Sequence, residues 1–342
     1  MERDLLADRL KAYACFLVLF GHVLRGVRLS GVEIPEVLYV AENFIWSFHV
    51  PLFLFLNGYV YRITGGSFSK GTGCGFVLRK LLNLGVPYTV FSVIYIVINS
   101  FVANTNTRSE LSDIFTVFTV PTAQYWYLYA LFFVFLVWTV LSRFAGNLQV
   151  TLILAAAGYI LPLFGVGFGG LEAAVYGAVP FGVGTLAVLD RVKSCKPFTR
   201  YAVIICHAVS GYILSACGLI GKAGIKEAAM LLGIAASVLF VYEATKLRAV
   251  GKCLDFLGKY SFQTFLLHTI FTAAARVALL RIGITSWAVH IVIGTLSGML
   301  FSVLFAYIAH KTLYLDFFFF PEKTLKSIKK RAARGKSGAG EC

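Results

Sequence analysis

Runs of about twenty apolar residues recur along the whole chain and constrain its fold more than any other feature. A helix needs about 20 mostly apolar residues to cross the hydrocarbon core of a bilayer. The hydrophobic fraction is 58% and charged residues make up 14%, against about a quarter in soluble domains. The sequence therefore predicts an all-α integral membrane protein, a bundle of about ten transmembrane helices. We expect these helices near residues 9–26, 42–62, 82–103, 122–142, 148–164, 170–189, 200–219, 227–246, 256–280 and 286–310.

The distribution of Lys and Arg predicts how this bundle is oriented. Basic residues accumulate on the cytoplasmic side of membrane proteins, and ten spans put both termini on one side. Placing both termini in the cytoplasm leaves only a few of the 31 basic residues outside, and Arg276 within a helix. The chain then divides into a membrane domain, 1–320, and a basic cytoplasmic tail, 321–342. We expect the tail to lack regular structure and to touch anionic lipid.

The first apolar segment carries a stripe of polar residues that cannot face lipid. Lys11 and His22 differ by about 20° around a helix and lie about 16 Å apart along it. Asp8 lies one turn before Lys11, and Arg25 lies one turn after His22. Ionisable groups inside a membrane are costly and suggest function by default. The stripe therefore predicts a proton path, an ion site or a catalytic centre.

Two further histidines fall at membrane depth. His49 lies near the outer end of the second predicted helix, and His268 lies near the middle of the ninth, on one face with Ser261 and Thr264. A histidine whose pKa lies near neutral pH can remove a proton from a hydroxyl. His49 can equally bond a carbonyl freed by the nearby Pro51, and His268 can equally have only a structural role.

The polar and aromatic residues near the outer ends of the helices give weaker signals. Glu42 lies seven positions before His49 and is a candidate to bind sugar hydroxyls or to tune a histidine, although a solvated helix end explains it equally well. Trp126 is a candidate to stack on a sugar ring, although an interfacial aromatic belt is the simpler explanation.

Several segments resemble the acyltransferase 3 family. The run DRLKAYACFLVLFGH is similar to the first-helix motif of that family, an acid, a base three positions on and a histidine after ten intervening residues. FHVPLFLFLNGYVYR is similar to its second-helix motif. Looser matches follow in the same order in LRKLLNLGVPYTVF, YWYLYALFFVF and LGKYSFQTFLLH. The resemblance spans residues 8 to 268.

The resemblance implies transfer of an acyl group from cytoplasmic acyl-CoA to a hydroxyl of a carbohydrate or other cell-envelope acceptor, in a multi-pass protein of the plasma (inner) membrane. By position, His22 takes the catalytic role, Lys11 the donor-binding role, and Asp8 orients Lys11. Arg62, Arg79 and Lys80 fall where the family places bases that meet coenzyme A phosphates. Acyl-CoA is then a cosubstrate, with no permanently bound cofactor and no metal.

Two departures from the family pattern bear on the donor. The family often has two arginines spaced by two residues, whereas Leu82 stands three positions after Arg79 and Asn83 three positions after Lys80. Asn57 stands where the family usually has Ser. Acetyl is the favoured group, and succinyl or another acyl group remains open.

The chemistry of the residues supports the same scheme. Hydrated phosphates stay at a basic cytoplasmic mouth, and an extended pantetheine arm is roughly as long as the 16 Å from Lys11 to His22. His22 then acts as general base or as a transient acyl carrier. His49, Asn57 and His268 are candidates to bond the oxyanion or to position the acceptor.

Other functional classes fit the sequence less well. A transporter or flippase of an envelope precursor is the main alternative, but such proteins often show internal repeats with broken helices, and the spacing of Lys11 and His22 does not recur. A non-catalytic subunit of an envelope-assembly complex is a third possibility. The charge lacks the motifs of a nucleic-acid partner, and the seven cysteines predict neither a disulfide framework nor a metal site. The sequence leaves the oligomeric state open.

Overall fold

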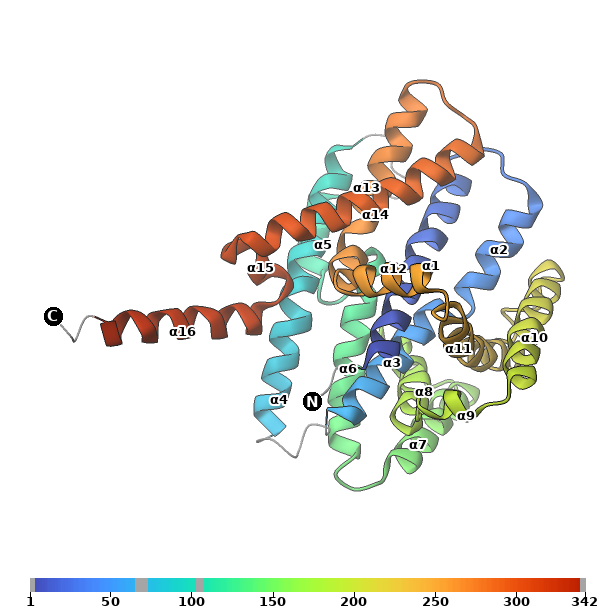
Figure 1. Cartoon of the computed structure of the whole chain (residues 1–342), viewed down its shortest axis with the longest axis horizontal. Coiled ribbons are helices and arrows are strands. Elements are labelled where there is room, and N and C mark those ends of the chain that lie inside the picture. Colours follow the sequence, from blue (N-terminus) through green and yellow to red (C-terminus); the bar gives the residue numbers. More distant parts are fainter. Residues whose placement is uncertain (1–3, 65–72, 103–107, 339–342) are drawn as a thin grey trace.

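The computed structural model describes residues 4–64, 73–102 and 108–338, which form helices and contain no β-strand (Figure 1). Their order is α1 Leu5–Leu29, α2 Glu36–Trp46, α3 His49–Ile63, α4 Gly73–Lys80, a π-helical turn Leu81–Gly85, α5 Val86–Phe101, short 3₁₀ turns at Leu111–Thr116 and Ala123–Tyr125, α6 Trp126–Leu141, α7 Asn147–Ile160, a 3₁₀ turn Leu161–Phe164, α8 Glu172–Leu186, α9 Arg191–Ser194, α10 Pro197–Ala216, α11 Ile225–Ala244, α12 Arg248–Gly258, α13 Ser261–Arg281, α14 Trp287–Lys311, α15 Leu313–Phe319 and α16 Pro321–Gly338.

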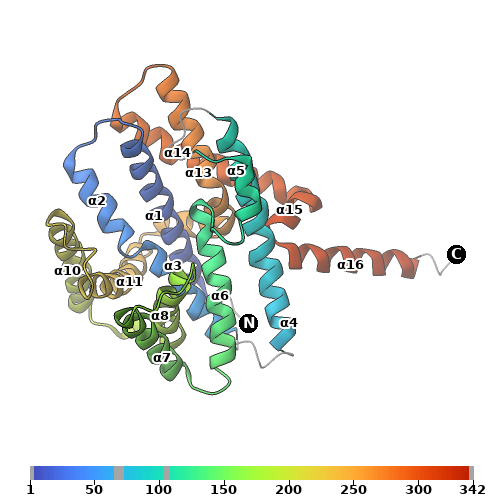
Figure 2. The same ribbon diagram turned by 180° about the vertical axis from the view of Figure 1, so that it is seen from behind.

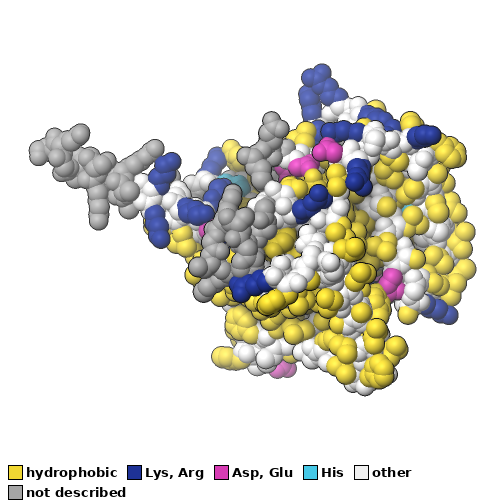
Figure 3. All heavy atoms as spheres, turned by 90° about the horizontal axis from the view of Figure 1, so that it is seen from below, with side chains coloured by type: hydrophobic (Ala, Val, Ile, Leu, Met, Phe, Trp, Pro, Cys, Tyr) yellow, Lys and Arg dark blue, Asp and Glu magenta, His cyan; other side chains and the backbone are white. Residues whose placement is uncertain are grey.

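The predicted all-α membrane bundle is confirmed. Within the described ranges, 9 helical segments are long and apolar enough to cross a membrane. Hydrophobic side chains cover much of the face in Figure 3, and Lys and Arg gather in a few places. On α14, large apolar side chains such as Leu300 and Leu304 are exposed, as expected for a helix that faces lipid.

The sixth expected span, 170–189, is not among these nine segments, because its helix is shorter than predicted. Helix α8 has 15 residues and contains Pro180. It packs on α3 with the two backbones nearly touching: a Cβ on Gly58 would lie 1.9 Å from the Phe181 carbonyl oxygen, and one on Gly184 would lie 2.0 Å from that of Phe55. Glycine is required at both positions, because any side chain there would force the helices apart.

The second span is broken where the sequence suggested one continuous helix over 42–62. It begins earlier, at Glu36, and α2 ends at Trp46 while α3 begins at His49. Ser47 donates its hydroxyl to the Phe44 carbonyl oxygen at 2.7 Å, and Pro51 has no N–H to continue the helical ladder. The break places His49 at the first turn of α3, inside the bundle.

Helix α1 occupies the centre of the bundle and contacts α2, α3, α11, α12, α13 and α14 (Figures 1 and 2). Because it is continuous from Leu5 to Leu29, Lys11 and His22 keep the separation that the helical rise predicts.

The basic tail differs from the expectation of no regular structure. Helix α16 extends from Pro321 to Gly338 and projects from the bundle beside α4 and α5 (Figures 1 and 2). Its first turn is tied to the bundle, because Asn83 donates its amide to Glu322 Oε2 at 2.8 Å. The two residues of this contact are far apart in the sequence, which explains why the composition of the tail did not predict it.

Candidate active site

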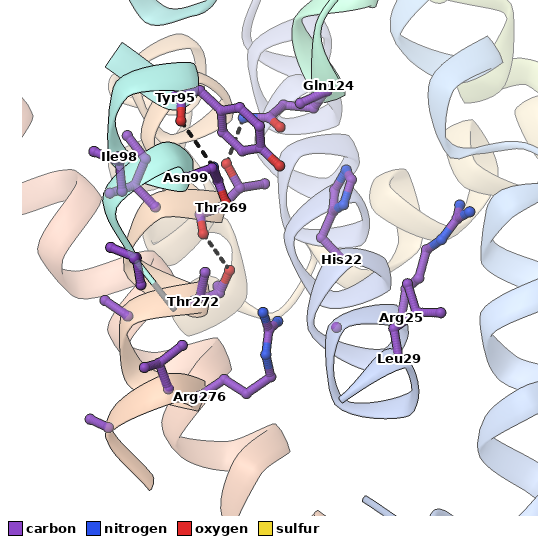
Figure 4. Close-up of a pocket in the computed structure, with 18 of the residues that line it drawn as sticks. His22, Arg25, Leu29, Tyr95, Ile98, Asn99, Gln124, Thr269, Thr272 and Arg276 are labelled. Atoms are coloured by element: carbon purple, nitrogen blue, oxygen red, sulfur yellow. Dashed lines mark hydrogen bonds between the residues drawn. The ribbon is translucent and has the colours of Figure 1, made fainter. Parts of the chain in front are cut away.

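His22 lines a cavity that we call the His22 cavity. It has a volume of about 850 Å³ and lies between α1, α5, α13 and the start of α6 (Figure 4). His22 is partly exposed to it. The polar and aromatic lining includes Arg25, Trp46, Tyr95, Asn99, Gln124, Trp126, Thr269, Thr272, Arg276 and Arg281. The predicted site residue Trp126 is thus brought to His22.

Three predicted histidines form one cluster. The rings of His22 and His268 have centroids 5.2 Å apart. The Trp46 ring lies between His22 and His49. Its centroid is 5.5 Å from that of the His22 ring and 5.1 Å from that of the His49 ring. The break between α2 and α3 is what allows Trp46 and His49 to face α1.

Hydrogen bonds define the proton positions on two of these rings. His49 Nδ1 lies 2.8 Å from the Ile45 carbonyl oxygen, and His268 Nδ1 lies 2.8 Å from that of Phe265. A carbonyl oxygen only accepts, so both Nδ1 atoms carry the hydrogen. The neutral rings therefore present a lone pair at Nε2. For His268 this atom is buried without a hydrogen-bond partner, so it can accept a proton or an N–H, and in the neutral form it cannot donate to an oxyanion.

A second cavity, the Lys11 cavity, has a volume of about 320 Å³. Asp8 Oδ1 lies 3.2 Å from Lys11 Nζ, and both residues line this cavity. Asn57 also lines it, and donates its amide to Tyr127 Oη at 2.7 Å. The structure therefore places Asn57, a predicted oxyanion or acceptor-positioning residue, beside Lys11 and not in the lining of the His22 cavity.

The two cavities follow one another along α1 and α13. On α13, the Lys11 cavity is lined between Ser261 and Phe265, and the His22 cavity from Thr269 onward. His268 lies between these stretches and touches Phe265, with ring centroids 6.3 Å apart. The histidine cluster therefore separates the cavities.

A third cavity of about 520 Å³ adjoins the Lys11 cavity, and we call it the α16 cavity. The two share Leu84, Phe262 and Phe320 as lining residues. Glu322, Lys323 and Lys326 of α16 line it. Lys326 is paired with Glu322 at 2.5 Å, and Lys323 adds a further positive charge on the way toward Lys11.

The predicted phosphate-binding residues lie elsewhere. Arg62 donates to the Ala187 carbonyl oxygen, and the Lys80 ammonium lies 3.5 Å from the centroid of the Phe135 ring. Arg62, Arg79 and Lys80 line none of the three cavities. Their role in donor binding stays a prediction.

Glu42 has a structural partner. Its carboxylate accepts two hydrogen bonds from Arg28, at 2.7 and 2.9 Å, and its side chain is 6% exposed. This buried ion pair joins α2 to α1, and it accounts for Glu42 without a sugar hydroxyl.

Sequence reasoning missed several polar residues of the His22 cavity. Gln124 donates its amide to Thr269 Oγ1 at 2.5 Å, and Asn99 donates to the Tyr95 carbonyl oxygen at 3.0 Å. Each was visible as a polar residue within or beside an apolar run, but their convergence depends on helix packing. No group of three or more His, Cys, Asp or Glu among the described residues is arranged to hold a metal ion.

A multi-pass helical bundle with a histidine cluster between two cavities is suited to group transfer inside a membrane. The acyltransferase 3 family model, described as an acyltransferase domain, matches residues 7–307. The chain belongs to this family, and the match places an acyltransferase domain over nearly all of its length.

A comparison with curated proteins gives a more distant relative. The nodulation protein NolL of Mesorhizobium japonicum is 28% identical over 163 residues, which are 46% of this chain and 40% of NolL. The match covers less than half of either protein. No solved structure matches the chain significantly.

Proposed function

We propose that this acyltransferase moves an acyl group, most simply acetyl, from cytoplasmic acyl-CoA to a hydroxyl of a carbohydrate or other cell-envelope acceptor. The observation that carries this proposal is the pair of cavities on either side of the histidine cluster. The Lys11 cavity, continued by the α16 cavity, is the donor path, and the His22 cavity is the acceptor site. The excess of basic residues on the donor side favours the cytoplasm for that side, in the plasma membrane.

The donor path fits the chemistry of coenzyme A. Its phosphates would pair with lysines at the α16 entrance, where Lys323 and Lys326 lie. The pantetheine arm would then extend along α1 past Lys11. Asp8 holds the Lys11 ammonium toward this path. The thioester carbonyl reaches the histidine cluster, roughly 16 Å further along α1.

His22 is the proposed base. In its neutral form it takes the proton of the acceptor hydroxyl, whose oxygen attacks the thioester carbonyl. The tetrahedral intermediate collapses, the C–S bond breaks, and the imidazolium of His22 returns the proton to the departing thiolate. The unpaired Nε2 of His268 is an acceptor for the far N–H of His22, so His268 is a positioning residue that selects the productive tautomer.

A covalent route uses the same residues. His22 attacks the thioester, coenzyme A leaves as thiolate, and the acyl-imidazole is then attacked by the acceptor hydroxyl. Incubation with labelled acetyl-CoA and no acceptor separates the routes. Label recovered on His22 supports the covalent route, whereas absence of label despite rapid turnover supports direct attack.

The test of the function is acetyl transfer by the purified protein. We expect His22→Ala to abolish transfer of labelled acetyl to a hydroxyl acceptor and His207→Ala to retain it. His207 is a suitable control because it is also a buried histidine in the bundle, packed against Phe44 and Phe48, and lines neither the donor path nor the acceptor site. Movement of an acceptor across the membrane without acyl transfer would contradict the proposal.

A further inference from the structure

Resting on the proposed function, we propose that the acceptor is an anionic carbohydrate, one that carries a carboxylate or a phosphate ester, and that Arg276 binds its negative group in the His22 cavity. The hydroxyl to be acylated would then lie near His22 on the same sugar.

The His22 cavity carries positive charge with no acidic side chain in its described lining. Arg25, Arg276 and Arg281 line it, and no Asp or Glu within the described ranges does. None of the three forms a salt bridge with a carboxylate among the described residues. Arg25 lies over the Trp46 ring, 4.5 Å from its centroid, and Arg281 stands at the outer end of α13.

Arg276 is the deepest of the three and the least satisfied. It lies inside α13, and its Nε is buried without a hydrogen-bond partner among the described residues. Figure 4 shows its guanidinium extending from α13 into the space between α13 and α1 into which His22 also projects. An arginine at membrane depth is costly unless it is paired, so its presence here points to a ligand that supplies the missing charge.

Other arginines that are at least partly buried in this fold pair with a carboxylate, and within the described ranges Arg276 does not. Arg9 pairs with Asp255 at 2.7 Å, Arg28 with Glu42 at 2.7 Å, and Arg200 with Glu243 at 2.6 Å. Each of these pairs joins two helices. Arg276 has no such partner in the described chain, and the cavity beside it is large enough for a sugar.

The rest of the cavity suits a carbohydrate that bears one anionic group. Trp126 offers a flat aromatic surface, and Asn99 and Gln124 bring amide groups within the same walls. The negative charge of coenzyme A does not explain Arg276, because the donor path lies on the other side of His268. Arg281, five positions further along α13, would guide the anion inward from the rim.

The experiment compares three acceptors with one pyranose ring: methyl glucoside, methyl glucuronide and glucose 1-phosphate. It uses the full chain in phosphatidylcholine vesicles. We expect kcat/KM to be about tenfold or more higher for the two anions, the usual effect of one charge-assisted hydrogen bond. In Arg276→Gln, kcat/KM for the anions divided by kcat/KM for methyl glucoside should fall to about one, because KM for the anions rises. Arg276→Lys should restore part of the ratio.

Lys222→Gln is the matched control, because it removes one positive charge from a loop outside the His22 cavity. The ratio should stay at its wild-type value. Equal losses for all three acceptors in Arg276→Gln would overturn the proposal, because Arg276 would then act on the reaction itself. Loss of the wild-type ratio on adding phosphatidylglycerol would also overturn it, because the cavity would then take a lipid phosphate.

Direct binding separates this inference from the proposed function. Glucose 1-phosphate should raise the unfolding temperature of the wild type more than methyl glucoside does, and this difference should disappear in Arg276→Gln. That result together with no acetyl transfer would contradict the acyltransferase scheme while leaving the anion site intact. No difference between the two sugars in the wild type would overturn the anion site.

Discussion

The ion pair between Arg28 and Glu42 gives an asymmetric prediction about stability. The Glu42 side chain is 6% exposed and that of Arg28 is 31% exposed. Arg28→Met leaves a carboxylate buried without its partner, a change that typically costs about 3 to 5 kcal/mol. The partial exposure of Arg28 means that water screens the pair, so we expect a value of about 3 kcal/mol.

The reverse change should cost much less. In Glu42→Gln the amide oxygen can still accept from Arg28, whose guanidinium also lies 5.8 Å from the centroid of the Tyr39 ring and can reach water. We expect about 1 kcal/mol. The double variant should be more stable than Arg28→Met alone, because no buried charge then lacks a partner.

Thermal unfolding in detergent measures these effects. With roughly 2 to 4 °C per kcal/mol, Arg28→Met should lower the apparent midpoint by about 6 to 12 °C. The exposed pair Lys193 and Asp190, with side chains 70% and 81% exposed, supplies the control, and Lys193→Met should change the midpoint little. A larger loss in Glu42→Gln than in Arg28→Met would refute the reasoning. Loss of transfer in Glu42→Gln without loss of stability would restore Glu42 as an acceptor-binding residue.

Three further predictions concern the packing of the bundle and the donor path. Gly184→Ala should prevent accumulation of folded protein, because its Cβ would meet a backbone oxygen at 2.0 Å. Gly167→Ala is the control, because its Cβ would lie in open space. The yield of monodisperse protein in size-exclusion chromatography measures both effects. Asp8→Asn should raise KM for acetyl-CoA about tenfold by freeing its partner lysine, and an unchanged KM would argue against that role. Lys323→Gln should raise KM for acetyl-CoA but leave KM for acetylpantetheine, which has no phosphates, unchanged. Equal increases in both KM values would show that Lys323 does not bind phosphate.

The sequence predicted those parts of the site that lie on one helix. Asp8, Lys11 and His22 belong to a continuous apolar segment, so helical geometry alone placed them on one face. The contact between His22 and His268 spans 246 positions, and the sequence indicated only that both were polar residues at membrane depth. The motif resemblance supplied their association with one family, which the match over residues 7–307 confirms.

The features that escaped prediction depend on contacts between helices. Hydropathy made 42–62 look like one helix, because Ser47 and Phe48 do not change the apolar character of the run. The close backbone contact between α8 and α3 depends on glycines in both helices, and composition alone could not show it. The cavity that Asn57 lines could not be predicted, because it depends on the packing of α3 against α6, where Asn57 donates to Tyr127.

The distribution of paired and unpaired charges along α1 and α13 supports opposite roles for the two cavities. On the donor side, Lys11 already has the Asp8 carboxylate at 3.2 Å, so it can guide a passing thioester without trapping a charged group. On the acceptor side, Arg276 has no such carboxylate in the described chain, so a strongly held anion gains the full pairing energy there. In the proposed scheme, the donor arm enters and leaves in every cycle, whereas the acceptor is held with one hydroxyl against His22. A paired lysine and an unpaired arginine meet these two requirements. An acidic residue introduced beside Arg276 would pair with it, and should lower the affinity for the acceptor without changing the affinity for the donor.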